Sequence, residues 1–198
     1  MHSKARKKAC IFSRFPVTPS TCSSRCFACA RFHEVNLKET LLCGPHQSDT
    51  SLDFWRFFSD SIAEWKKGRF MTAFEYQLGT EKVNVTGSPR VLWMSAQLPF
   101  HRVIAGPWSA TFRPEFAWDR DGRWTGSKQT IKAMTTTLEC RLPYWKTNTI
   151  ARLEYRVDDS RGARAGFFRG AEASPGAVAL EPTQQLLAFG LIVTFESR

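Results

Sequence analysis

Charged side chains of opposite sign alternate at two-residue intervals in the second half of the sequence. The clearest run is Arg152, Glu154, Arg156 and Asp158, in which a single aliphatic or aromatic residue separates each charge from the next. Carboxylates next to guanidinium groups form ion pairs, whereas general acid–base catalysis needs a carboxylate placed beside a histidine or a nucleophile. No histidine accompanies these carboxylates, so we expect a protein that is not an enzyme.

A second group of reactive side chains lies near the start of the chain. Cys26 and Cys29 form one chelating pair, and Cys43 and His46 form another. Two such pairs can hold zinc in a tetrahedral site. Residues 35–43, however, have the pattern of a strand, which would carry Cys43 away from the first pair. Free thiols and no cofactor are therefore the favoured interpretation, and zinc is the alternative.

The elements that must position the charged run show a period of two residues. In residues 108–119, Trp108, Phe112 and Phe116 alternate with Arg113 and Glu115. Because successive side chains of a strand point to opposite faces, this pattern predicts an aromatic face and a charged face. The same pattern occurs in residues 70–78, 134–142 and 147–158, and a weaker form in residues 35–43, 54–65, 92–100 and 185–195. Gly, Pro, Asn and Asp lie between these segments, so the sequence predicts about eight antiparallel strands.

The length of these segments distinguishes a membrane barrel from a soluble sheet. Strands of globular proteins most often have about 5 to 6 residues, and strands that cross a bilayer about 9 to 11. Several of the segments reach the longer range, so we expect an all-β, antiparallel, up-and-down transmembrane β-barrel, or an incomplete part of one. Its charged face would line the lumen. The residues expected there are Glu75, Arg113, Glu115, Asp119, Glu139, Arg141, Arg152, Glu154, Arg156 and Asp158.

The net charge of +10 is distributed unevenly along the 198 residues. The first 50 residues hold eight Lys and Arg against three Asp and Glu, which is half of the excess, and they also hold five of the six cysteines. We expect residues 1–34 to be a basic, Cys-rich, disordered leader and residues 35–198 to be the barrel domain. The basic leader alone is a weak signal for nucleic-acid binding, which we do not expect.

A soluble β-barrel or sandwich is the alternative to a membrane protein. Such a protein would bury its apolar face in a core and bind a ligand at its centre. The leader would then serve as a zinc or nucleic-acid-binding module.

Six segments of the chain resemble the OmpL-like beta-barrel porin family of bacterial outer membranes. They are residues 55–60, 74–81, 113–122, 137–141, 152–160 and 187–195. The most specific feature is the Arg-x-Glu-x-Arg-x-Asp strand that is followed by an apolar last strand. The resemblance extends from about residue 35 to the end.

The resemblance implies an outer-membrane porin that contacts lipid and lets small polar solutes or ions pass without catalysis. Members of the family are usually longer, so the chain is expected to be a C-terminal portion that does not conduct alone. The start of the chain has no legible secretory signal, because residues 1–8 are followed by only a short apolar stretch. The resemblance is compatible with a homo-oligomer and leaves the solute open.

Overall fold

The computed structural model describes residues 24–32, 34–45, 54–83, 87–144, 147–163, 165–174 and 177–195. In these ranges the backbone is almost entirely extended. No helix in them has the length and the apolar character that crossing a membrane would require. The strands are β1 Ser24–Phe32, β2 Val35–Pro45, β3 Trp55–Lys67, β4 Phe70–Lys82, β5 Arg90–Gln97, β6 Phe100–Ala105, β7 Trp108–Asp119, β8 Gln129–Tyr144, β9 Thr147–Arg161, β10 Phe167–Ser174, β11 Ala177–Glu181 and β12 Thr183–Phe195.

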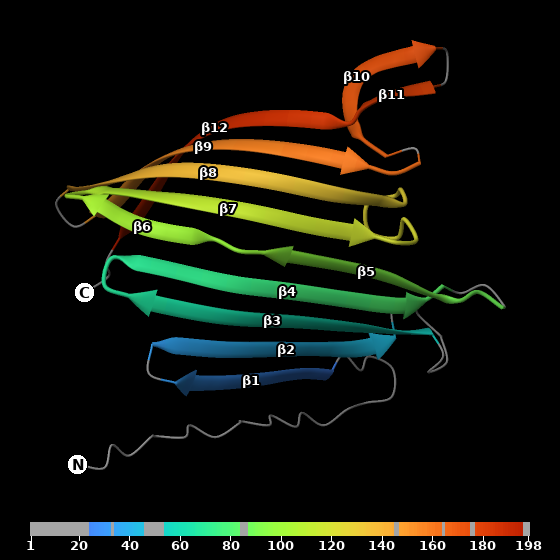
Figure 1. Ribbon diagram of the computed structural model, residues 1–198, viewed down its shortest axis with the longest axis horizontal. Helices are drawn as coiled ribbons and strands as arrows, with labels where there is room; N and C mark the ends of the chain where they lie inside the picture. The colour runs from blue at the N-terminus through green and yellow to red at the C-terminus, as the bar shows by residue number, and fades with distance from the viewer. Residues whose placement is uncertain are drawn as a thin grey trace.

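Ten of these strands form one antiparallel sheet in which most neighbouring strands are consecutive along the chain, and β12 follows β9 after the separate β10–β11 hairpin. The order is β1-β2-β3-β4-β5-β7-β8-β9-β12, and β6 continues the row of β5 between β4 and β7. Figure 1 shows this sheet as a single layer, with β1 and β12 at its edges and the β10–β11 hairpin standing apart. Within the described residues β1 pairs only with β2, and β12 only with β9.

The all-β, antiparallel, up-and-down arrangement confirms the fold class expected from the sequence. The eight expected segments correspond to β2, β3, β4, β5, β7, β8, β9 and β12. The expected loop between β9 and β12 contains the β10–β11 hairpin, which the sequence pattern did not reveal. At the other end, β1 lies within the expected leader and pairs along its whole length with β2, so the sheet begins before residue 35. Residues 1–23 of that leader lie outside the described residues.

Two prolines lie where the row formed by β5 and β6 is interrupted: Pro99 within the row and Pro114 on the strand opposite. Leu98 and Pro99 separate the two strands and face Pro114 of β7. Because proline has no N–H, it cannot donate to a ladder. The Pro114 carbonyl still accepts the Leu98 N–H at 3.1 Å, and the Pro99 carbonyl accepts the Ala73 N–H at 3.2 Å. Pro114 therefore lies opposite the gap between β5 and β6, where no ladder hydrogen bond from its nitrogen is needed. For this reason β7 continues without interruption to Asp119.

One face of this sheet carries polar side chains that are buried, and the opposite face carries apolar side chains that are exposed. Along β8, Thr135 and Thr137 are 1% and 7% exposed, whereas Met134 and Leu138 are 51% and 39% exposed. Among the described side chains, Ala133 is the buried hydrophobic one, while several ionisable and hydroxyl side chains are almost fully buried. A water-soluble protein has the opposite distribution, because burial of apolar surface drives its folding.

Candidate functional site

The expected charged residues share one face of the sheet, which we call the polar face. Its register places Gln97 of β5 between Glu75 and Glu115, and Ala133 of β8 between Glu115 and Asp158. Residues directly opposite one another in a ladder point to the same face, and so do residues two apart along a strand. These rules place all ten residues on the polar face: Glu75, Arg113, Glu115, Asp119, Glu139, Arg141, Arg152, Glu154, Arg156 and Asp158.

Arg156 is the centre of the ion pairs on this face. Its Nη1 lies 2.7 Å from Glu115 Oε2 on β7, and its Nη2 lies 2.8 Å from Asp158 Oδ1. Glu115 also accepts a hydrogen bond from Arg113. Asp158 is 2% exposed and accepts a further hydrogen bond from Gln184 of β12 at 2.9 Å. The Arg156 guanidinium group thus joins β7 to β9, and two carboxylates compensate its charge.

A second ion pair joins β8 and β9 closer to their shared turn. Arg152 Nη2 lies 2.5 Å from Glu139 Oε1. Within the described ranges, Glu154 accepts a single hydrogen bond, from the Thr137 hydroxyl group at 3.1 Å. Arg141 is exposed and has no ion pair among the described residues. The ten residues are therefore on one face but do not form one continuous ladder.

A third set of charges on the same face was missed by the sequence analysis. Glu81 is 1% exposed and binds both Arg56 of β3, at 2.6 Å, and Arg123 of the β7–β8 loop. The Arg56 guanidinium lies over the Trp93 ring, 5.6 Å from its centroid. Glu81 follows Glu75 at an even spacing along β4, but it lies beyond residue 78, where the expected segment 70–78 ends. Extending the pattern would have found it, but Arg123 belongs to a turn and has no periodic signal.

Asp119 closes the β7–β8 loop by hydrogen bonds to the backbone. Its Oδ1 accepts the Arg123 N–H at 2.9 Å, and its Oδ2 accepts the N–H groups of Trp124 and Thr125, both at 2.7 Å. A carboxylate that accepts several N–H groups in this way fixes a turn. The buried Asp119 thus organises a loop, rather than extending the expected row of ion pairs.

This loop contributes to a cavity of about 290 Å³ on the polar face. The cavity lies between β4, β5, β7, β8 and β9, and the loop adds Trp124 and Thr125 to its lining. Its charged lining residues are Glu75, Glu115 and Arg156. Charged groups of both signs therefore line a space that is large enough for a small solute.

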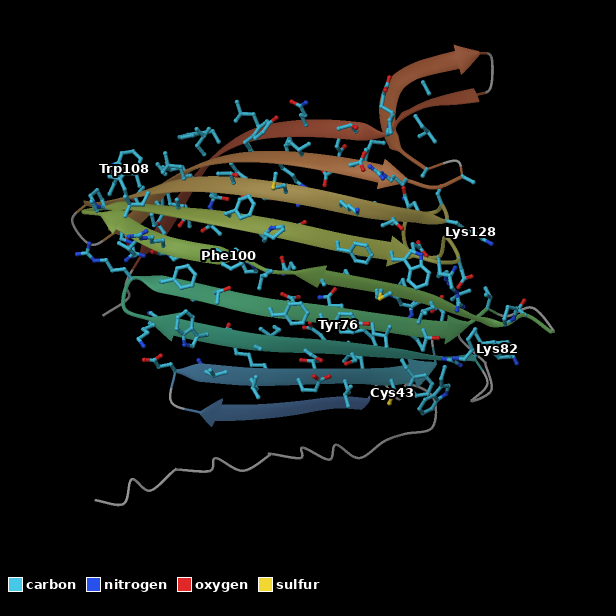
Figure 2. The ribbon with its side chains drawn as sticks, in the orientation of Figure 1. Cys43, Tyr76, Lys82, Phe100, Trp108 and Lys128 are labelled. Carbon is cyan, nitrogen blue, oxygen red and sulfur yellow. The ribbon has the colours of Figure 1, made fainter. Side chains whose placement is uncertain are left out.

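The opposite face of the sheet, which we call the apolar face, carries aromatic and aliphatic side chains. Phe112, Phe116, Leu153 and Tyr155 are 42%, 38%, 45% and 43% exposed. Figure 2 shows Tyr76 in the middle part of β4, Phe100 at the start of β6 and Trp108 at one end of β7, while Lys82 and Lys128 lie at the opposite ends of the strands. Among the described residues no second layer covers this face.

The alternative zinc site does not fit the register of the first two strands. Cys29 pairs with Lys38 and Ser24 pairs with Cys43, so Cys29 and Cys43 lie five ladder positions apart. At about 3.3 Å per residue this separation is about 16 Å. Zinc–sulfur bonds of about 2.3 Å need thiolates that are far closer to each other. His46 lies outside the described residues, and Cys43 and Cys140 are free thiols.

The polar interior and apolar exterior are features of a sheet that faces lipid. A model of the family described as "Putative beta-barrel porin-2, OmpL-like" matches residues 31–195. The chain belongs to this family. Comparisons with curated proteins and with solved structures gave no match. Membership of the OmpL-like porin family supports a porin-like role and suggests the bacterial outer membrane as the location.

Proposed function

We propose that this OmpL-like chain forms the wall of an outer-membrane barrel through which small polar solutes or ions pass by diffusion. Its apolar face would contact lipid and its polar face would contact water and solute. The protein would act without catalysis and without a cofactor, because its carboxylates are engaged in pairing rather than placed beside a nucleophile. The proposal combines the family membership with the charge pattern of the sheet.

The single observation that carries the proposal is the inverted burial of the two faces. Thr135 and Asp158 are nearly inaccessible on one face, while Met134 and Leu153 are about half exposed on the other. Burying polar groups and exposing apolar ones costs free energy in water, whereas hydrocarbon makes the same arrangement favourable. The soluble β-sandwich alternative requires the reverse, and no observation in the described residues favours it.

The ion pairs of the polar face support a wet interior. Arg156 is bound by Glu115 and Asp158, and Arg152 is bound by Glu139, so most charges are compensated locally. Compensated charges keep such a surface hydrated without attracting one kind of ion strongly. Such a surface is suited to polar solutes of several types.

The proposal is tested with the full chain refolded in detergent and inserted into liposomes at a density that lets several copies assemble, since one copy is expected not to conduct alone. We expect swelling of the liposomes with a monosaccharide and none with a large dextran, together with gel migration that changes on heating. Protein-free liposomes that received the same detergent serve as the control. A monodisperse protein in detergent-free buffer, with no swelling activity after insertion, would show the proposal to be wrong.

A further inference from the structure

Most carboxylates of the polar face are compensated by a partner. Glu81, Glu115, Glu139 and Asp158 each bind at least one guanidinium group, and Asp119 accepts three backbone N–H groups. In the part of the chain that the structure describes, Glu154 is bound by a hydroxyl group only. A carboxylate without a cationic partner keeps its negative charge, and such carboxylates determine the net charge that a passing ion would meet.

Glu75 is such a carboxylate, and it lies in the wall of the cavity. Its Oε1 accepts a hydrogen bond from Gln77 at 2.8 Å, and its Oε2 accepts one from Gln97 at 2.5 Å. Among the described residues it has no ion pair. Neutral amide donors fix the position of the carboxylate but do not cancel its charge. The side chain is thus held in place with its negative charge available to the cavity.

The surroundings of Glu75 hold a second carboxyl group and no guanidinium group bound to Glu75 among the described residues. Asp60 of β3 is directly opposite Gln77, next to Glu75 on the polar face, and its buried Oδ1 has no hydrogen-bond partner in the described part of the chain. The nearest guanidinium group in the cavity wall is that of Arg156, which Glu115 and Asp158 already neutralise. Among the described residues that line the cavity, an entering anion would therefore find no unpaired cation, whereas an entering cation would find a fixed carboxylate.

We propose that Glu75 makes the passage selective for small cations, such as potassium or a primary ammonium, over anions. This inference rests on the proposed function. The cation would lie in the cavity beside Glu75 and would exchange part of its hydration shell for the carboxylate oxygens. A charge at contact distance in water-filled space changes the local ion concentration by roughly fivefold, which sets the scale of the preference.

The test is the reversal potential of the refolded full chain in a planar bilayer with a tenfold gradient of potassium chloride. We expect the wild type to favour potassium, and Glu75→Gln to lose roughly fivefold of the permeability ratio of potassium to chloride. Glu154→Gln is the matched control, because it removes the same charge from the polar face but outside the cavity lining. It should keep most of the preference. Heat-modifiable gel migration shows whether each variant is folded.

The outcomes separate the inference from the proposed function. Folded wild-type protein without conductance would contradict both. A conducting protein whose Glu75→Gln and Glu154→Gln variants shift equally would contradict the inference alone, because only the total charge of the face would then matter. A preference for chloride in the wild type would also overturn the inference. A larger loss for Glu75→Gln than for Glu154→Gln would support it.

Discussion

Single residues on the polar face are fixed by close packing as well as by charge. Trp93 lies directly against Gly79, its partner in the ladder, and a Cβ atom at Gly79 would overlap the indole ring. The Arg56 guanidinium covers the same ring and binds Glu81. Because Gly79 has no side chain, the Trp93 indole can lie against its backbone. In this position the indole is covered by Arg56, which binds the buried Glu81 carboxylate.

Gly79→Ala should destabilise the protein, because the added methyl group displaces Trp93 and, with it, Arg56. Overpacking of this kind costs about 1 to 3 kcal/mol. The measurement is the free energy of unfolding in urea, together with the tryptophan fluorescence of the folded state in detergent. Gly190→Ala is the control, because a Cβ atom at that strand position has no atom within 4 Å. Equal stability of the two variants would contradict the packing argument.

At the scale of elements, the β7–β8 loop reaches past β5 and binds β4, which is not a neighbour of β7 or β8. Asp119 fixes the turn, and Arg123 then binds Glu81 across β5. This bond holds Trp124 and Thr125 in the cavity lining. The loop thus narrows the polar face instead of extending away from the sheet.

Arg123→Ala should loosen the loop and raise the single-channel conductance, because Trp124 is then free to leave the cavity. Loss of one partly exposed charged hydrogen bond weakens the attachment by about 1 kcal/mol. Glu81 keeps its bond to Arg56, so the strands should remain folded. Lys128→Ala removes an exposed positive charge from the same loop and is the control. Unchanged conductance in Arg123→Ala would show that the loop does not limit passage.

At the scale of the whole molecule, the sheet has no apolar core among its described residues. Many of its apolar side chains lie exposed on the apolar face, including Phe189 at 75% and Leu187 at 68% on the edge strand β12. A single layer of strands cannot bury such a face by itself. The surroundings must therefore supply the apolar contacts, and we propose that the lipid bilayer does so.

Leu153→Arg should destabilise the protein in lipid vesicles by about 2 to 4 kcal/mol, because Leu153 lies near the middle of β9 on the apolar face. Leu142→Arg is the matched control. It is also exposed on that face but lies near the end of β8, where the cost falls to about 0 to 1 kcal/mol. Unfolding by urea in vesicles measures both. If the two variants cost the same small amount, the apolar face does not contact hydrocarbon.

The sequence by itself determined which side chains share a face. The alternation in residues 108–119 predicted both ends of β7, and the Arg152 to Asp158 run predicted the polar face of β9, because a period of two is a local property of an extended chain. The same reasoning found neither β6 nor the β10–β11 hairpin, since their residues show no clear alternation.

Only the tertiary structure decided which charges meet. The Glu115–Arg156 pair, the bond from Arg123 to Glu81 and the cation-free position of Glu75 depend on the register between strands and on the fold of one loop. A register shift of a single residue would move every partner to the other face. Strand periodicity carries no information on that register, so residue types and spacing predicted the polar face but not the place on it where we propose that ions are selected.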